Sequence, residues 1–169
     1  MKDRKHQQAQ LMAAMITYYQ GDPKRVHHFL KVHDFAAAIG VLEALDPQTQ
    51  WILETAAIVH DIGIKISEEK YGNCNGKHQE EEGPPLARKM LEELGFEASV
   101  IDRVCYLVGH HHSYSHIDGI DHQILVEGDF LVNLYEDEAP RHAVEKAYRT
   151  IFHTETGRQF CRESFGLKS

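Results

Sequence analysis

The feature of this sequence that most restricts its fold is an almost unbroken succession of segments with helical periodicity. Apolar residues recur every three or four positions, and no segment shows the strict alternation of a half-buried strand. The breaks "GDP" at 21–23, "LDP" at 45–47, "GPP" at 83–85 and "LGF" at 94–96 combine turn residues, prolines near helix starts and a terminal glycine. The sequence therefore predicts an all-α fold with helices over 4–20, 23–45, 47–60, 84–95, 97–112, 120–136, 140–152 and 155–164.

The segment 66–80, "ISEEKYGNCNGKHQE", departs from this pattern. It is polar and contains Gly72 and Gly76, so it predicts a flexible connection. Such a loop is either a lid over a site or only a link between helices. In the first case Tyr71 and Asn73 are the candidate substrate contacts.

The size and charge of the chain limit its architecture and its partners. A chain of 169 residues, 42% of them hydrophobic, is expected to form one compact domain over 1–169. Its net charge of −8 argues against a nucleic-acid polymer as partner, because such binding needs many Lys and Arg contacts. The polar N-terminus and the lack of a long apolar run predict neither a signal peptide nor contact with a membrane.

Three cysteines without a C-x-x-C pair indicate a reduced, cytoplasmic chain, in which they are expected to pack as small apolar residues. The oligomeric state is left open by the sequence.

Thirteen histidines are unusual for this length, and helix geometry indicates which of them face the core. In the second predicted helix, His28 shares a stripe with Val32 and Ala36. His27 and His33 are rotated from it by about 100° or more and are expected to face water. His28 is therefore the inward histidine of this helix.

The stretch "AAIVHDIGIK" at 56–65 places a histidine and an aspartate at the end of an apolar run. Ala56 and Ala57 leave space beside His60, which is expected to point inward. Asp61 then ends the turn, and Gly63 is expected to cap it. Two ionisable groups at this position need a partner of opposite charge.

The run "HHH" at 110–112 contains three histidines with different directions. Stepping 100° per residue, His111 falls about 30° from the middle of the apolar face, His112 about 70° and His110 about 130°. His111 is the first inward candidate and His112 the second, whereas His110 is expected to lie outside.

The segment "ILVEGDFLVNL" at 124–134 is apolar on nearly every side, yet holds Asp129 in its middle. A buried unpaired carboxylate costs several kcal/mol or takes up a proton. Asn133, one turn later, is placed to orient it. One divalent metal ion would satisfy these inward groups together, and the mixed set suits Mn, Fe, Co, Ni or Zn, with Mg as a further option. The predicted metal ligands are His28, His60, Asp61 and Asp129.

These residues resemble the HD-domain superfamily of metal-dependent phosphohydrolases, and the match spans 25–136. The motif residues are Arg25-x-x-His28-x-x-x-Val32-x-x-x-Ala36, then His60-Asp61-Ile62-Gly63, then His111-His112, then Asp129. The resemblance implies the family's compact helical bundle. It also implies that the four predicted ligands hold the metal in the family's H…HD…D order.

The family's second-metal pattern is matched only in part. Members with a second metal add a histidine in an H-x-x-x-G pattern and a His-His pair. Here Gly83 places Gln79 at the histidine position, with His78 one residue earlier. His111 and His112 fit the pair, so these four side chains are candidates for a second ion or for contacts with a substrate phosphate.

The sequence also departs from the branch of the family that cleaves cyclic dinucleotides. In that branch a lysine directly follows HDIG, whereas here Ile64 does and Lys65 comes next. The branch's GYP segment is also absent. The chain is interpreted as a small stand-alone HD protein.

The resemblance implies hydrolysis of a phosphoester in a small molecule, with a nucleotide as the expected substrate, by a metal-activated water. Asp61 would orient or deprotonate the water. Lys65 and a protonated His111 or His112 would offset the charge on the phosphate, although Lys65 fits a solvated lysine equally well. Arg25 is expected to pair with a buried carboxylate.

Other functions remain as alternatives. An HD-type di-iron oxygenase would need a full second-metal shell, and a non-catalytic nucleotide-binding module would keep the metal without turnover. A purely structural metal fits less well, because such sites recruit cysteine or close completely. The predicted C-terminal helix, which begins at Thr154, suggests no function.

Overall fold

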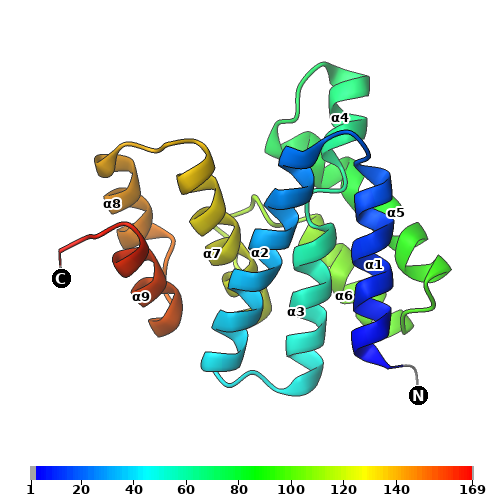
Figure 1. The fold of residues 1–169 in the computed structure, drawn as a ribbon, viewed down its shortest axis with the longest axis horizontal. Coiled ribbons are helices and arrows are strands. Elements are labelled where there is room, and N and C mark those ends of the chain that lie inside the picture. The colour runs from blue at the N-terminus through cyan, green and yellow to red at the C-terminus, as the bar shows by residue number, and fades with distance from the viewer. Residues whose placement is uncertain (1–2, 169) are drawn as a thin grey trace.

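The computed structural model describes residues 3–168, and this part of the chain contains nine α-helices and no strand (Figure 1). The all-α prediction is therefore confirmed. The helices are α1 (Arg4–Tyr18), α2 (Pro23–Leu42), α3 (Pro47–Val59), α4 (Ile64–Tyr71), α5 (Gly76–Glu93), α6 (Ala98–Val108), α7 (Gly119–Glu136), α8 (Arg141–Thr150) and α9 (Glu155–Ser164).

The helix starts follow local capping chemistry. Asp22 accepts a hydrogen bond from the Arg25 amide at 3.2 Å, and Asp46 accepts from the amides of Gln48 and Thr49, each at 3.0 Å. Helices α2 and α3 then begin with proline, whose missing N–H costs nothing in the first turn. The predicted breaks before these two helices are confirmed.

Helix α2 lies at the centre of the fold, with α3 and α7 packed against it (Figure 1). Gly128 of α7 lies against α2, where a Cβ would be in ordinary van der Waals contact, 3.4 Å from both the Ala36 Cβ and the Val32 carbonyl oxygen. Asp129 is the next residue, so the packing of α7 against α2 places it beside α2. The core thus brings the middle of α7 to the N-terminal half of α2.

The expectations for 66–95 are wrong in two respects. The polar segment is mostly helical, because α4 continues to Tyr71 and α5 begins at Gly76 after Asn75, whose side chain accepts from the His78 amide at 3.0 Å. The "GPP" sequence does not mark the start of a helix, since Pro84 and Pro85 lie inside α5. Each proline removes an intrahelical hydrogen bond, and packing of α5 against α6 offsets this loss.

Two expectations about burial are also corrected. His33 is buried, with 7% of its surface exposed, although His27 faces water as expected. The reason is that α2 contacts α3, α7 and α9, so its buried face is wider than one stripe. Cys105 and Cys161 are buried free thiols, whereas Cys74 is partly exposed in the α4–α5 connection.

Among residues 3–168, no helix combines the length and the hydropathy that a membrane span requires.

Candidate metal centre

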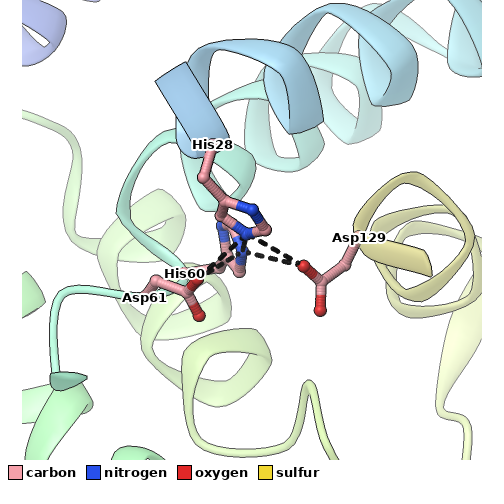
Figure 2. A group of neighbouring side chains, drawn as sticks. All are labelled: His28, His60, Asp61 and Asp129. Atoms are coloured by element: carbon pink, nitrogen blue, oxygen red, sulfur yellow. Dashed lines mark hydrogen bonds and ion pairs between the residues drawn. The ribbon is translucent and has the colours of Figure 1, made fainter. Parts of the chain in front are cut away.

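Two histidines and two aspartates from three parts of the chain converge beside α2 (Figure 2). His28 comes from the second turn of α2, His60 and Asp61 follow the end of α3, and Asp129 comes from the middle of α7. One ligand atom from each side chain lies within 4.8 Å of the others. The structure therefore brings together the four predicted ligands.

The centre of this cluster is the Nε2 atom of His28. It lies 3.0 Å from Asp61 Oδ2, 3.2 Å from Asp129 Oδ1 and 3.3 Å from His60 Nε2. The His60 Nε2 atom is in turn 3.3 Å from each of the same two carboxylate oxygens. His60 is fully buried and Asp129 is 2% exposed, so water does not screen these groups.

The outer ring nitrogens of both histidines already have acceptors. His60 Nδ1 donates to the Ala57 carbonyl oxygen at 2.7 Å, and His28 Nδ1 donates to Glu136 Oε1 at 3.1 Å. In the neutral rings, both Nε2 lone pairs therefore point into the cluster, toward each other and toward two carboxylates. Such a concentration of electron pairs in a buried site fits a divalent cation.

The cluster perturbs the pKa values of its members. Burial raises the pKa of Asp61, but the charge of His60 and the contacts with His111 and His28 outweigh it and hold that pKa well below its usual value. Burial likewise opposes the lowered pKa of Asp129, which hydrogen bonds with His28 and His60 produce. Both carboxylates are therefore ionised at neutral pH, as metal ligands must be.

The two histidines show the complementary effect. Burial lowers the pKa of His28, but hydrogen bonds with Asp129 and Asp61 prevail and raise it to about 10. The pKa of His60 is also raised well above its usual value, because Asp61 and Asp129 together overcome its burial. Metal binding must therefore displace protons from the cluster.

His111 points inward, as predicted, and is fully buried. Its Nδ1 donates to the Val108 carbonyl oxygen at 2.8 Å, whereas its Nε2 has no hydrogen-bond partner within residues 3–168. That Nε2 lies 3.4 Å from Asp61 Oδ1, on the opposite side of the carboxylate from His28. His110 lies outside the cluster, as predicted, and stacks on Tyr106.

His112 has a fixed tautomer. The Cys74 carbonyl oxygen accepts from Gln79 Nε2, so the Gln79 amide oxygen faces His112 Nε2 at 2.9 Å and that nitrogen must carry the hydrogen. His112 Nδ1 then accepts from the Tyr114 hydroxyl at 3.0 Å. Burial and the neighbouring His111 lower the pKa of His112 to about 4, so it is neutral at pH 7 and not the expected cation.

The structure does not bring Lys65, Tyr71, Asn73 or His78 to the cluster. Lys65 is exposed, and its Nζ lies 3.4 Å from the Tyr18 carbonyl oxygen, over the ring of that tyrosine. Tyr71 and His78 stack on each other with ring centroids 3.8 Å apart, and His78 contacts Asn73 at 3.1 Å. The proposed substrate contacts in 66–80 thus pair with one another at the surface.

A cavity of about 140 Å³ opens above the cluster. The residues that line it are Lys24, Arg25, His28, Asp61, Ile64, Gln79, His112, Asp129, Asn133, Glu136 and Asp137. Arg25 pairs with Glu68 at 2.8 Å and with Asp22 at 3.8 Å. These carboxylates are about half exposed, so the expected buried partner of Arg25 is corrected.

The turn that carries Asp61 is held by close backbone packing. Gly63 has a φ of −76° and is not a left-handed cap, contrary to expectation. A Cβ at Gly63 would lie 2.7 Å from the Gln79 carbonyl oxygen and 2.9 Å from the Gly83 nitrogen, so the glycine lets α5 pass directly beside the turn. Tyr19 donates its hydroxyl to the Asp61 carbonyl oxygen at 2.6 Å and secures the other side.

Three residues that line the cavity are not predicted as site residues from the sequence, namely Lys24, Glu136 and Asp137. A signal for Glu136 was present. It follows Asp129 by seven residues and therefore lies on the same face of α7, in line with Asn133. Asn133 Nδ2 donates to Asp129 Oδ1 at 3.0 Å, which confirms the predicted orienting contact.

The fold and the cluster define an all-helical protein with an ordered H…HD…D set of side chains. The family model of the HD domain matches residues 25–148. This chain belongs to the HD-domain family.

A crystal structure of a predicted HD superfamily hydrolase from an uncultured Thermotogales bacterium has a similar fold, with a TM-score of 0.67. The two proteins are 22% identical, and the alignment covers 94% of this chain and 84% of the other. The comparison with curated proteins found no match.

Proposed function

We propose that this protein is a metal-dependent phosphohydrolase that cleaves a phosphoester in a small molecule, with a nucleotide as the first substrate class to test. The observation that carries the proposal is a set of two ionised carboxylates and two imidazole Nε2 atoms in the floor of an open cavity. A structural metal would be closed off. Here the side chains of Asp61 and His28 are 14% and 8% exposed toward that cavity.

His28, His60, Asp61 and Asp129 would hold the ion. When bound, a divalent metal lowers the pKa of a water molecule and polarises a phosphoryl oxygen. The two oxygens of Asp61 have different neighbours, with Oδ2 facing His28 and Oδ1 facing His111. Asp61 can therefore act as a ligand through one oxygen and accept a proton from water at the other.

Lys24 replaces Lys65 as the proposed phosphate contact. Lys24 and Arg25 are the cations that line the cavity, and Arg25 is already paired with Glu68. Lys24 forms no ion pair with any residue in 3–168. It can thus offset phosphate charge without first breaking another interaction.

Replacing Lys24 by alanine is expected to raise KM for a phosphorylated substrate roughly tenfold with little change in kcat, as for a lost substrate contact. Steady-state kinetics with the metal-loaded protein would measure it. Lys65→Ala is the matched control, because it removes a lysine outside the cavity and should leave KM unchanged. A raised KM in Lys65→Ala with an unchanged KM in Lys24→Ala would instead identify Lys65 as the phosphate contact.

The proposed function is tested by phosphate release from a panel of nucleotides and other phosphomonoesters, with Mn²⁺ or Co²⁺ supplied. We expect release from at least one compound and none with Asp129→Ala. Tight nucleotide binding without product would favour the regulatory module, and substrate-dependent oxygen uptake without phosphate release would favour the oxygenase.

A further inference from the structure

We infer that Glu136 is a positioning residue, which sets the tautomer and orientation of His28 and strengthens its Nε2 as a metal ligand. The inference rests on the proposed metal centre and does not depend on the identity of the substrate. Glu136 is the last residue of α7, and its side chain is 12% exposed.

The histidines that point toward the cluster, His28, His60 and His111, each donate through Nδ1, and two of them find the acceptor in the helix that precedes them. His60 directly follows the last residue of α3, and His111 follows α6 by three residues. Both donate to the carbonyl three residues earlier, at 2.7 and 2.8 Å. The last carbonyls of a helix lack intrahelical partners and are therefore available.

No unpaired backbone carbonyl of α2 is available to accept from His28 Nδ1 in the same way. It is the sixth residue of α2, where the surrounding carbonyls accept hydrogen bonds from the following turn. Its Nδ1 instead donates to Glu136 Oε1 at 3.1 Å, a residue 108 positions later in the chain. The acceptor that the local backbone cannot provide thus comes from the end of α7.

Lys31 completes the arrangement. Its Nζ lies 3.1 Å from the same Glu136 oxygen, and it is one turn after His28 on α2. This ion pair holds in place the carboxylate oxygen that faces the imidazole. A carboxylate acceptor of this kind raises the basicity of a ligating histidine and prevents rotation of its ring.

The test is Mn²⁺ affinity measured by titration calorimetry in the absence of substrate. Glu136→Ala is expected to weaken Mn²⁺ binding by about 10- to 100-fold, the usual effect of removing such a partner. Glu136→Gln should lie between this variant and the wild type, because its amide oxygen still accepts from Nδ1 but carries no charge.

Asp137→Asn is the matched control, since Asp137 lines the same cavity but, among the described residues, is hydrogen-bonded to none of the four ligand side chains. Its affinity should equal that of the wild type. Unfolding curves of the metal-free variants would show that Glu136→Gln, which keeps the side-chain volume, is folded.

An unchanged affinity in Glu136→Ala, or an equal loss in Asp137→Asn, would overturn the inference. This outcome would leave phosphohydrolase activity in place. Conversely, a wild-type protein that binds Mn²⁺ but releases no phosphate would contradict the proposed function, while a loss of affinity in Glu136→Ala would still support the role of Glu136.

Discussion

Replacement of Asp61 or Asp129 by alanine is expected to reduce the metal content from about one ion per chain to near zero, because each change removes a charged ligand. The remaining members of the cluster would be left without that ligand oxygen, which lies within 3.3 Å of both His28 Nε2 and His60 Nε2. Elemental analysis of untagged, unchelated protein, before and after supply of Mn²⁺, would measure this.

His111→Ala is the informative comparison, because it removes a buried imidazole that contacts Asp61 but leaves all four residues of the cluster in the chain. We expect it to retain about one ion. Asp61, His111 and His112 form a second group of possible ligands, but Gln79 holds His112 with its hydrogen on Nε2, so this group lacks a complete ligand set. Two ions in the wild type, with one lost in His111→Ala, would contradict a single-ion site and favour the di-iron oxygenase. A wild type that binds no supplied metal would contradict the centre itself.

Gly63→Ala is expected to lower the free energy of unfolding of the metal-free protein by about 1–3 kcal/mol, as overpacking does. The backbone at Gly63 is helical, so alanine brings no dihedral strain. The cost comes from a Cβ placed against the backbone of α5, which can move only as a unit. Because Asp61 is two residues away, metal affinity should fall as well. Urea denaturation and calorimetry would measure the two effects.

Gly109→Ala is the control for this change. Gly109 has a similar φ of −74°, but the nearest atom to an added Cβ is the Pro84 Cγ at 3.3 Å, which belongs to a side chain. Its stability should change by less than about 1 kcal/mol. Equal stabilities of the two variants would show that the contact between Gly63 and α5 does not exclude a larger side chain at position 63.

The helices and the inward histidines were predictable because the relevant information is local. Asp22 and Asp46, each followed by proline, mark the starts of α2 and α3. The direction of His28 and His111 follows from the apolar stripe of the same helix. The HD pair and Asp129 likewise follow from short apolar runs that contain ionisable groups, so the four-residue cluster could be written down before the fold was known.

The remaining errors arise where a neighbouring element decides the outcome. His33 is buried because α2 has several neighbours, which its own periodicity does not reveal. The position of Lys65 shortly after HDIG predicts that it lies in the site. A new helix, α4, begins at Ile64 and directs Lys65 toward Tyr18.

The polarity of the segment 66–80 predicts a loop, although the segment also contains residues that end and start helices. Gly72 has a φ of 73° and terminates α4, and Asn75 caps α5. Both helices expose much of their surface in this region, so the apolar stripe that identifies a helix is weak. Capping residues were the better signal here.

His28 and Asp129 are in contact although 101 residues separate them in the chain. A cation held by both would close a loop of that length, so part of its binding energy becomes resistance to unfolding. A free metal concentration about 100 times the dissociation constant would add about 2.7 kcal/mol to stability, against a usual total of about 5–15 kcal/mol. The lifetime of the folded chain against proteases would therefore rise and fall with the metal supply of its surroundings.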